Sequence, residues 1–219
     1  MSMGHVGPAV TRRREATRER ILDAARDVFA ERGVYGGTVE DICSRAGFTR
    51  GAFYSNFADK DEVLRALIAR EHARLLERLD ASFALVDETA AGVTGDPRPV
   101  LAPLADRILR SVPTDRLFSL IQDELEIHAV RDPEVARAFL EADDRFRARV
   151  AEFLERALAR FGRELVVAPD QATDAVIAIV ERSSRRALLA DPEADPYELA
   201  ITILPLVMVA LSRPRASAT

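Results

Sequence analysis

The chain has 219 residues, of which 48% are hydrophobic and 31% are charged, and its formal net charge is −5. This composition supports a folded core and excludes a wholly disordered chain, a collagen-like repeat and a disulfide-rich scaffold. Cys43 is the single cysteine, so no intrachain disulfide forms, and no apolar run of 18 residues is present to span a bilayer. We therefore expect a soluble cytoplasmic protein.

Charge is divided unevenly along the chain. Residues 1–70 contain 12 Lys or Arg and 10 Asp or Glu, a net of +2, which leaves −7 for the remainder. Four arginines lie close together near the start, at positions 12, 13, 14 and 18. A basic end on an acidic body indicates where a polyanionic partner would meet the protein. A disordered basic tail explains the same pattern, so charge alone leaves both interpretations open.

Hydrophobic periodicity predicts helices along most of the chain. Residues 1–14 have no apolar period, and we expect a flexible basic arm there. The helices are expected at about 17–33, 38–46, 49–57, 60–85, 100–111, 114–130, 133–161, 170–190 and 196–212. The Gly- and Pro-rich segment 87–99 is expected to be a linker. No convincing β-alternation is present, so the expected fold class is all-α.

Residues 38–57 have the pattern of a helix-turn-helix. The first helix carries one apolar stripe, and Gly47 permits a sharp turn before Thr49 caps the second helix. On the second helix Phe53 and Phe57 face the core, and the polar face carries Arg50, Gly51, Tyr54, Ser55 and Asn56. A guanidinium, an amide and two hydroxyls favour recognition of DNA. Short helical hairpins also have purely structural roles, so this spacing leaves both interpretations open.

From Thr17 to Leu67 the sequence resembles the TetR family of transcriptional regulators. The resemblance rests on the segments ILDAA (21–25), TVEDI (38–42), AGFTRGAFYSNF (46–57) and DKDEVL (59–64), together with Phe29 and Gly33. Cys43 replaces the family's usual alanine, Ser55 an aromatic residue and Asn56 a histidine. The remaining two-thirds of the chain matches the family only in architecture.

The resemblance implies an all-α homodimer whose subunits have a helix-turn-helix DNA-binding domain at 15–60 and a larger ligand-binding and dimerisation domain at 61–219. Such a protein binds double-stranded DNA at a palindromic operator, an inverted repeat. It usually represses transcription, and a small-molecule effector releases it. It is nucleoid-associated while bound to its operator. Carried over residue by residue, the expected DNA contacts are Thr38, Thr49, Arg50, Gly51, Tyr54, Ser55, Asn56 and Lys60. Of these, Thr38, Thr49, Tyr54 and Lys60 are expected to contact phosphates.

The C-terminal part of the chain has weaker signals. Phenylalanines recur every seven or eight positions along 133–161, which is typical of a core stripe and compatible with an apolar ligand cavity. The candidate ligand contacts are Phe118, Gln122, Glu126 and Phe146. The last helix is apolar almost all round, which predicts burial against a second copy of the chain. The expected dimer contacts are Val176, Val180, Leu204, Leu206, Val207 and Leu211.

An enzyme is the main alternative class, but the sequence lacks a Gly-x-Ser-x-Gly elbow, a Walker loop and a dinucleotide-binding glycine motif. We expect no catalytic residues, no metal and no cofactor. Glu124 and His128 have a spacing that can bind metal, but no second His or Cys is in register, which favours an ordinary polar face. Cys43 is expected in the core. A helical ligand-binding or interaction protein with a degenerate helix-turn-helix stays open as an alternative function.

Overall fold

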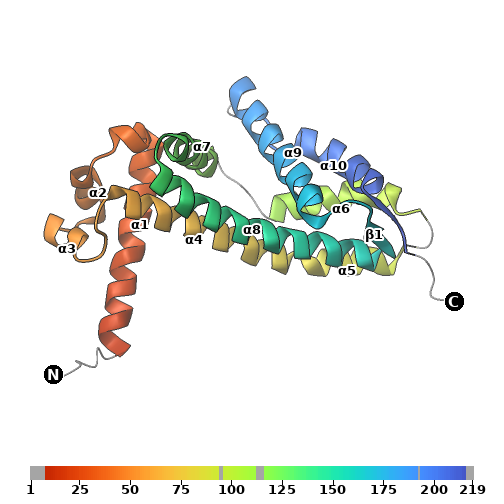
Figure 1. Ribbon diagram of the computed structural model, residues 1–219, viewed down its shortest axis with the longest axis horizontal. Helices are drawn as coiled ribbons and strands as arrows, with labels where there is room; N and C mark the ends of the chain where they lie inside the picture. The colour runs from red at the N-terminus through yellow and green to blue at the C-terminus, as the bar shows by residue number, and fades with distance from the viewer. Residues whose placement is uncertain (1–7, 94–95, 112–115, 192, 216–219) are drawn as a thin grey trace. The chain divides into compact units, whose positions relative to one another are not determined.

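The computed structural model describes residues 8–93, 96–111, 116–191 and 193–215, and within these ranges most of the chain is helical (Figure 1). The helices are α1 (Pro8–Gly36), α2 (Val39–Ala46), α3 (Arg50–Tyr54), α4 (Lys60–Ala81), α5 (Phe83–Ala91), α6 (Arg98–Ser111), α7 (Arg116–Arg131), α8 (Pro133–Arg160), α9 (Pro169–Ala190) and α10 (Glu198–Ala210). The expected all-α class is confirmed. None of the described helices is long and apolar enough to cross a bilayer.

The chain divides into two compact units. Unit 1 comprises residues 1–71 and 120–140, and unit 2 comprises residues 72–119 and 141–219. Unit 1 therefore contains α1, α2 and α3, the start of α4, most of α7 and the start of α8. This division differs from the expected boundary at residue 60. No local signal in the sequence marks the packing of α7 in unit 1, because its contacts there join residues about 90 positions apart.

The core of unit 1 is built from the apolar faces of its helices. Ile21, Ile42, Phe53 and Leu67 are each at most 1% exposed, and Leu125 of α7 is 2% exposed. Cys43 is also buried, as expected for a small core residue, and burial raises the pKa of its thiol. Each short helix is thus fixed by side chains that a neighbouring helix covers.

Helix α1 is longer than the sequence suggested. The flexible arm was expected to reach residue 14, but the helix begins at Pro8; residues 1–7 lie outside the described part. Proline is tolerated in a first helical turn, and the Arg-, Glu- and Ala-rich segment that follows consists of good helix formers. Such a segment propagates a helix that is already packed further along, although it has no apolar period of its own.

The long helix expected over 60–85 is interrupted. Helix α4 ends at Ala81, and α5 begins at Phe83 and continues to Ala91, so the predicted linker starting at residue 87 was placed too early. At the break the Ser82 hydroxyl donates to the Leu79 carbonyl, a local bond that competes with the helical pattern. Similarly, α3 ends at Tyr54, three residues before the expected Phe57.

A two-stranded antiparallel ribbon joins β1 (Arg163–Leu165) to β2 (Ser212–Pro214) in unit 2. The sequence does not predict this ribbon, because strands of three residues are too short to show alternation. The pairing is reinforced by Arg163, whose guanidinium donates to the Ser212 carbonyl at 2.7 Å and to the Val209 carbonyl at 3.2 Å. The Val209 carbonyl belongs to the last turn of α10.

The core of unit 2 contains a cluster of Phe83, Val86, Leu104 and Phe153. The rings of Phe83 and Phe153 meet edge to face, with centroids 5.8 Å apart. The predicted phenylalanine stripe of α8 therefore includes a core residue at Phe153.

Gly33 interrupts α1 with φ +72° and ψ 165°, a conformation that residues with a Cβ rarely adopt. A Cβ at this position would lie 2.7 Å from a carboxylate oxygen of Glu124. We expect Gly33→Ala to lower the free energy of unfolding by about 2 kcal/mol, from backbone strain and displacement of Glu124. Urea unfolding followed by circular dichroism measures the change.

Gly36→Ala is the control, because a Cβ there meets only the Arg32 Cβ at an ordinary 3.6 Å. It should leave stability unchanged or raise it by up to about 1 kcal/mol. Equal stabilities for the two variants would contradict the role given to Gly33.

Candidate nucleic-acid interface

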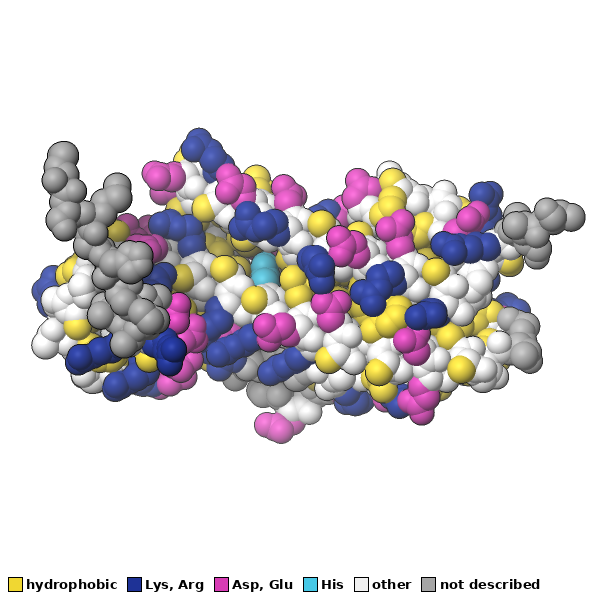
Figure 2. Space-filling model, turned by 90° about the horizontal axis from the view of Figure 1, so that it is seen from below, with side chains coloured by type: hydrophobic (Ala, Val, Ile, Leu, Met, Phe, Trp, Pro, Cys, Tyr) yellow, Lys and Arg dark blue, Asp and Glu magenta, His cyan; other side chains and the backbone are white. Residues whose placement is uncertain are grey.

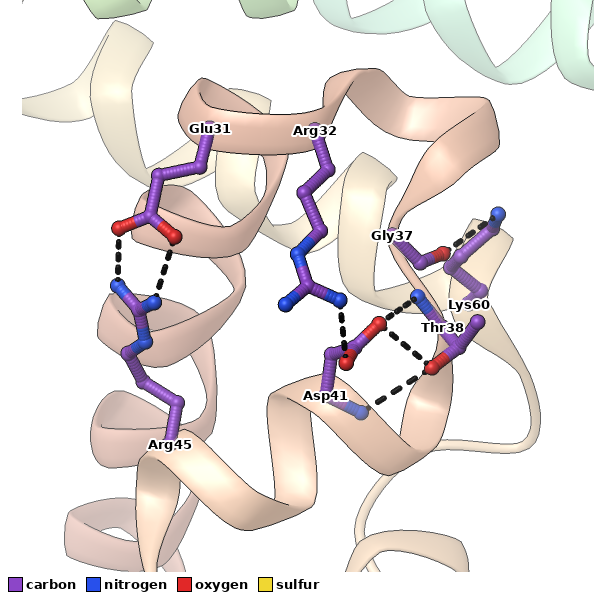
Figure 3. Close-up of polar contacts among 7 residues, drawn as sticks. All are labelled: Glu31, Arg32, Gly37, Thr38, Asp41, Arg45 and Lys60. Atoms are coloured by element: carbon purple, nitrogen blue, oxygen red, sulfur yellow. Dashed lines mark hydrogen bonds and ion pairs between the residues drawn. The ribbon is translucent and has the colours of Figure 1, made fainter.

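The first helix of the expected helix-turn-helix starts with a capping box. The Thr38 hydroxyl accepts from the Asp41 N–H at 3.1 Å and donates to the Asp41 carboxylate at 2.8 Å, and that carboxylate accepts from the Thr38 N–H. These bonds lower the pKa of Asp41. Arg32 of α1 adds an ion pair to the same carboxylate at 2.6 Å (Figure 3). The Thr38 hydroxyl is thus engaged on both sides, which leaves it poorly placed for a phosphate.

The turn between α2 and α3 depends on Gly47. Its φ of +69° and ψ of 35° lie in the left-handed region, and its N–H donates to carbonyls of the last turn of α2. Arg20 of α1 reinforces this helix end by donating to the Ala46 carbonyl at 2.9 Å, with its guanidinium 4.6 Å from the centre of the Phe48 ring. The predicted sharp turn is present where the glycine allows it.

Helix α3 presents a polar face outward. Its N-cap Thr49 accepts from the Ala52 N–H at 3.2 Å, and Phe53 turns its ring into the core. The outward residues are Arg50, Gly51, Tyr54 and Ser55, all exposed. The hydroxyl of Tyr54 and the carboxylate of Glu40 both raise the pKa of Arg50. Four of the five residues predicted for the recognition face are therefore brought together.

Asn56 does not share that face. Its side chain is only 9% exposed and donates to the Ala52 carbonyl at 2.8 Å and to the Ser55 hydroxyl at 3.3 Å. Since α3 ends at Tyr54, residue 56 no longer follows the helical register that would point it outward. The prediction of an outward-facing Asn56 is wrong for this structure. The Asn56 amide instead hydrogen-bonds to the last turn of α3.

Lys60 is the only lysine in the sequence. Its ammonium donates to the Val34 carbonyl at 2.7 Å. It also donates to the Gly37 carbonyl at 3.1 Å, the bond drawn in Figure 3. These carbonyls belong to the end of α1 and the turn that follows it. Lys60 therefore ties α4 to the α1–α2 turn, and a phosphate contact would compete with these bonds.

Arginines of α1 lie beside the end of α3. Arg14 donates to the Ser55 carbonyl at 3.4 Å, and Arg18 donates to the Asn56 carbonyl and lies 4.0 Å from the centre of the Phe57 ring. Figure 2 shows Lys and Arg side chains distributed along this face of the molecule, with acidic side chains among them. The basic segment predicted as an arm is thus part of the helical unit that carries α3.

Residues 21–67 match the family model described as "Bacterial regulatory proteins, tetR family". The chain is 51% identical over 59 residues to the HTH-type transcriptional regulator SrpR of Pseudomonas putida, which is 26% of this chain and 28% of SrpR. It is 30% identical over 109 residues to AcrR of Shigella flexneri, 50% of this chain and 47% of AcrR. Each match spans less than half of the relative's own length.

Among solved structures, SmeT, the repressor of a Stenotrophomonas maltophilia multidrug efflux pump, is 28% identical with a TM-score of 0.55 and covers 91% of this chain and 92% of its own. A TetR-family regulator of Mesorhizobium loti has a TM-score of 0.69 at 19% identity over 91% and 96% of the two chains. FadR of Bacillus subtilis, solved with stearoyl-CoA, has a TM-score of 0.62 at 18% identity over 88% and 96%. Residues 21–67 of this chain therefore belong to the tetR family of bacterial regulatory proteins. Members of this family are transcriptional regulators and not enzymes.

In this chain two residues of α7 contact the α1–α2 turn, a role that the sequence does not indicate. The Glu124 carboxylate accepts from the Val34 N–H, and the His128 Nδ1 lies 3.0 Å from the Tyr35 hydroxyl. The His128 Nε2 lies 3.8 Å from the Asp61 carboxylate at the start of α4. In the sequence, Glu124 and His128 stand out only for a spacing that can bind metal. Contacts across about 90 residues leave no local signal from which to predict them.

The four predicted ligand contacts are divided between the two units. Phe118 and Phe146 both lie in unit 2 beside His72, with centroids 6.1 and 4.6 Å from its ring, and the Phe146 ring is stacked on it. Gln122 and Glu126 lie in unit 1, where the Gln122 amide donates to the Glu126 carboxylate at 3.4 Å. The aromatic pair thus gathers around a buried imidazole that the sequence analysis did not single out.

The predicted dimer residues differ in exposure. They lie on α9, on α10 and at Leu211, which follows α10. Leu206 is 66% exposed in the single chain, whereas Leu204 is 8% exposed and packs inside unit 2. Val176, Val180, Val207 and Leu211 are half-buried. Of the six, Leu206 offers the most apolar surface to a second copy.

The bonds of Lys60 predict a structural role. Lys60→Met keeps the apolar stem and removes the donor to two carbonyls, so we expect the free energy of unfolding to fall by about 2 kcal/mol. Arg65→Met on the same helix removes the same charge and is the control. Urea unfolding of both variants measures the difference. Unchanged stability of Lys60→Met, with weaker binding to all DNA duplexes alike, would show instead the phosphate contact implied by the family resemblance.

Proposed function

We propose that this protein is a transcriptional repressor that binds an inverted-repeat operator as a homodimer and leaves it when a small molecule binds. The observation that carries the proposal is the outward face of α3, where Arg50, Gly51, Tyr54 and Ser55 are exposed on a helix held by buried phenylalanines. Guanidinium groups donate in pairs to guanine, and hydroxyls bind base edges or phosphates. A helix-turn-helix of this kind places its second helix in the major groove.

Of the proposed phosphate contacts, Thr49 and Tyr54 have the better support. The Thr49 hydroxyl accepts from its own helix and, within the described part of the chain, has no acceptor for its own proton. Tyr54 is 49% exposed. A hydroxyl at the start of a helix lies where the helix dipole favours an anion.

The homodimer is supported by the composition of α10. This helix is apolar along most of its length, and exposed Leu206 lies on it. Packing α9 and α10 against the same helices of a second copy would bury that surface in a four-helix bundle with two-fold symmetry. Two-fold symmetry in the protein matches an inverted repeat in the DNA, with half-sites one helical turn or a multiple of it apart.

Control by a small molecule is supported by the cluster around His72. The rings of Phe118 and Phe146 and the half-buried Asp143, whose pKa burial raises, surround a buried imidazole. Mixed aromatic and polar surroundings suit an apolar molecule with a polar end, and the solved relative FadR binds stearoyl-CoA. A compound that stabilises the protein against heat should also release DNA, and both effects should weaken in Phe146→Ala. Stabilisation without release would contradict this part of the proposal.

Helix α7 supports the same control. It carries Phe118 of the aromatic cluster and, further along, Glu124 and His128 at the α1–α2 turn. A ligand that displaces Phe118 would act on a helix whose other residues hold the DNA-binding helices. Differential binding of one ligand to two states by a hundredfold corresponds to about 2.7 kcal/mol of coupling.

DNA binding is tested by selection. We expect the protein to enrich inverted repeats from a random-sequence 40-bp duplex pool. Arg50→Ala should weaken binding to the selected duplex by about 1–3 kcal/mol and relax the preference at one base pair per half-site. Arg45→Ala removes an equal charge from α2, where Arg45 pairs with Glu31 at 2.6 Å, and should leave the preference unchanged. Equal losses on selected and random duplexes would exclude Arg50 as a base contact.

The dimer is tested by Leu206→Arg. Because Leu206 is exposed in the single chain, this change should leave the fold intact. It should convert the dimer to a monomer in sedimentation velocity at about micromolar concentration, where a stable dimer interface keeps the subunits together. Val130→Arg, at an 89% exposed valine of α7, is the matched control and should stay dimeric. A dimer that survives Leu206→Arg would place the interface elsewhere.

A further inference from the structure

The first turn of α2 contains two carboxylates with different roles. Asp41 completes the capping box with Thr38. Glu40 instead points to the recognition helix, where its Oε1 lies 2.7 Å from the Arg50 guanidinium. The side chains of this pair are 57% and 63% exposed. An exposed ion pair contributes little to folding stability. A carboxylate in the first turn of α2 also favours the helix dipole, but that interaction does not require a bond to the recognition helix.

The position of Glu40 matters because of what Arg50 would otherwise do. A freely moving guanidinium binds any phosphate, and phosphate contacts supply most non-specific affinity without reading sequence. In this structure Arg50 lies between two groups of unit 1, the Glu40 carboxylate and the ring of Tyr54, whose centre is 5.9 Å away. Such a held side chain loses less conformational freedom when it binds a base.

The bond to Glu40 is compatible with contact to a base. A guanidinium has five N–H donors, and a guanine uses two of them. Glu40 can therefore stay bonded to Arg50 while Arg50 reads guanine. A phosphate at the same place would instead meet the Glu40 carboxylate, and like charges at close range repel.

We propose that Glu40 is a specificity-determining residue for DNA binding. Its carboxylate positions Arg50 for guanine and repels phosphate, so it weakens binding to random DNA more than binding to the operator. This inference rests on the proposed DNA-binding function.

The experiment compares Glu40→Gln and Glu40→Ala with Glu31→Gln as control. Glu31 forms a matching exposed pair with Arg45, at 2.6 and 2.7 Å, so its variant removes the same charge from the same unit (Figure 3). Affinity is measured over a range of salt on two probes, a random-sequence 40-bp duplex pool and the duplex that the unmutated protein selects from it.

Glu40→Gln should tighten binding to the random pool about five- to tenfold at 0.1 M salt, the factor that one added phosphate contact supplies. The salt dependence should steepen by up to about one unit of slope, and binding to the selected duplex should tighten less. Glu40→Ala, which also removes the acceptor for Arg50, should in addition relax the base preference that Arg50→Ala relaxes. Glu31→Gln should change each affinity by less than about twofold, since its charge lies off the recognition face.

Two results would overturn the inference. One is an equal increase in DNA affinity in Glu31→Gln and Glu40→Gln, which would show that the effect depends only on the net charge of the protein. The other is an unchanged ratio of selected to random affinity in both Glu40 variants. Failure of the unmutated protein to enrich any sequence would overturn the proposed function itself, and it is detected before any variant is measured.

Discussion

The α1–α2 turn is the point on which the DNA-binding unit depends. Its backbone groups have partners from three other helices: Lys60 of α4 on the Val34 and Gly37 carbonyls, Glu124 of α7 on the Val34 N–H, and Asp41 of α2 on the Thr38 N–H. Gly33 makes this possible because only a residue without a Cβ leaves room for the Glu124 carboxylate. The orientation of α2, and through it that of α3, therefore depends on where α4 and α7 place the residues that contact this turn.

Several cations of this unit contact backbone carbonyls. Lys60, Arg18 and Arg20 donate to backbone carbonyls at helix ends or turns, where the negative end of a helix dipole favours them. These residues contribute to folding stability, and their cationic groups are already hydrogen-bonded within the protein. Arg50 differs because its partner is an exposed side chain that it can share with a base. Net basic charge in residues 1–70 is thus a poor guide to which side chains meet DNA.

Much of the fold was predictable from local signals, and the reasons are visible in particular residues. Thr38, Gly47 and Thr49 are start and stop residues whose chemistry acts within a few positions, so α2, the turn and the start of α3 were predicted correctly. Asn56 was misplaced because the end of a five-residue helix decides which way it points. Glu124, His128 and the β1–β2 ribbon act through partners 49 to 93 positions away, and a single sequence carries no record of such pairing.

The acidic net charge bears on how such a protein would meet DNA. A chain of net charge −5 has weak long-range attraction to a polyanion, and salt at physiological concentration screens what remains beyond about 8 Å. In the proposed dimer, affinity would then come from short-range contacts at α3 and from two subunits binding at once. That balance suits a protein that discriminates between sequences, because non-specific attraction raises the occupancy of every competing site in a genome. The exposed Glu40 beside Arg50, the arginine proposed to contact bases, would likewise favour discrimination between sequences.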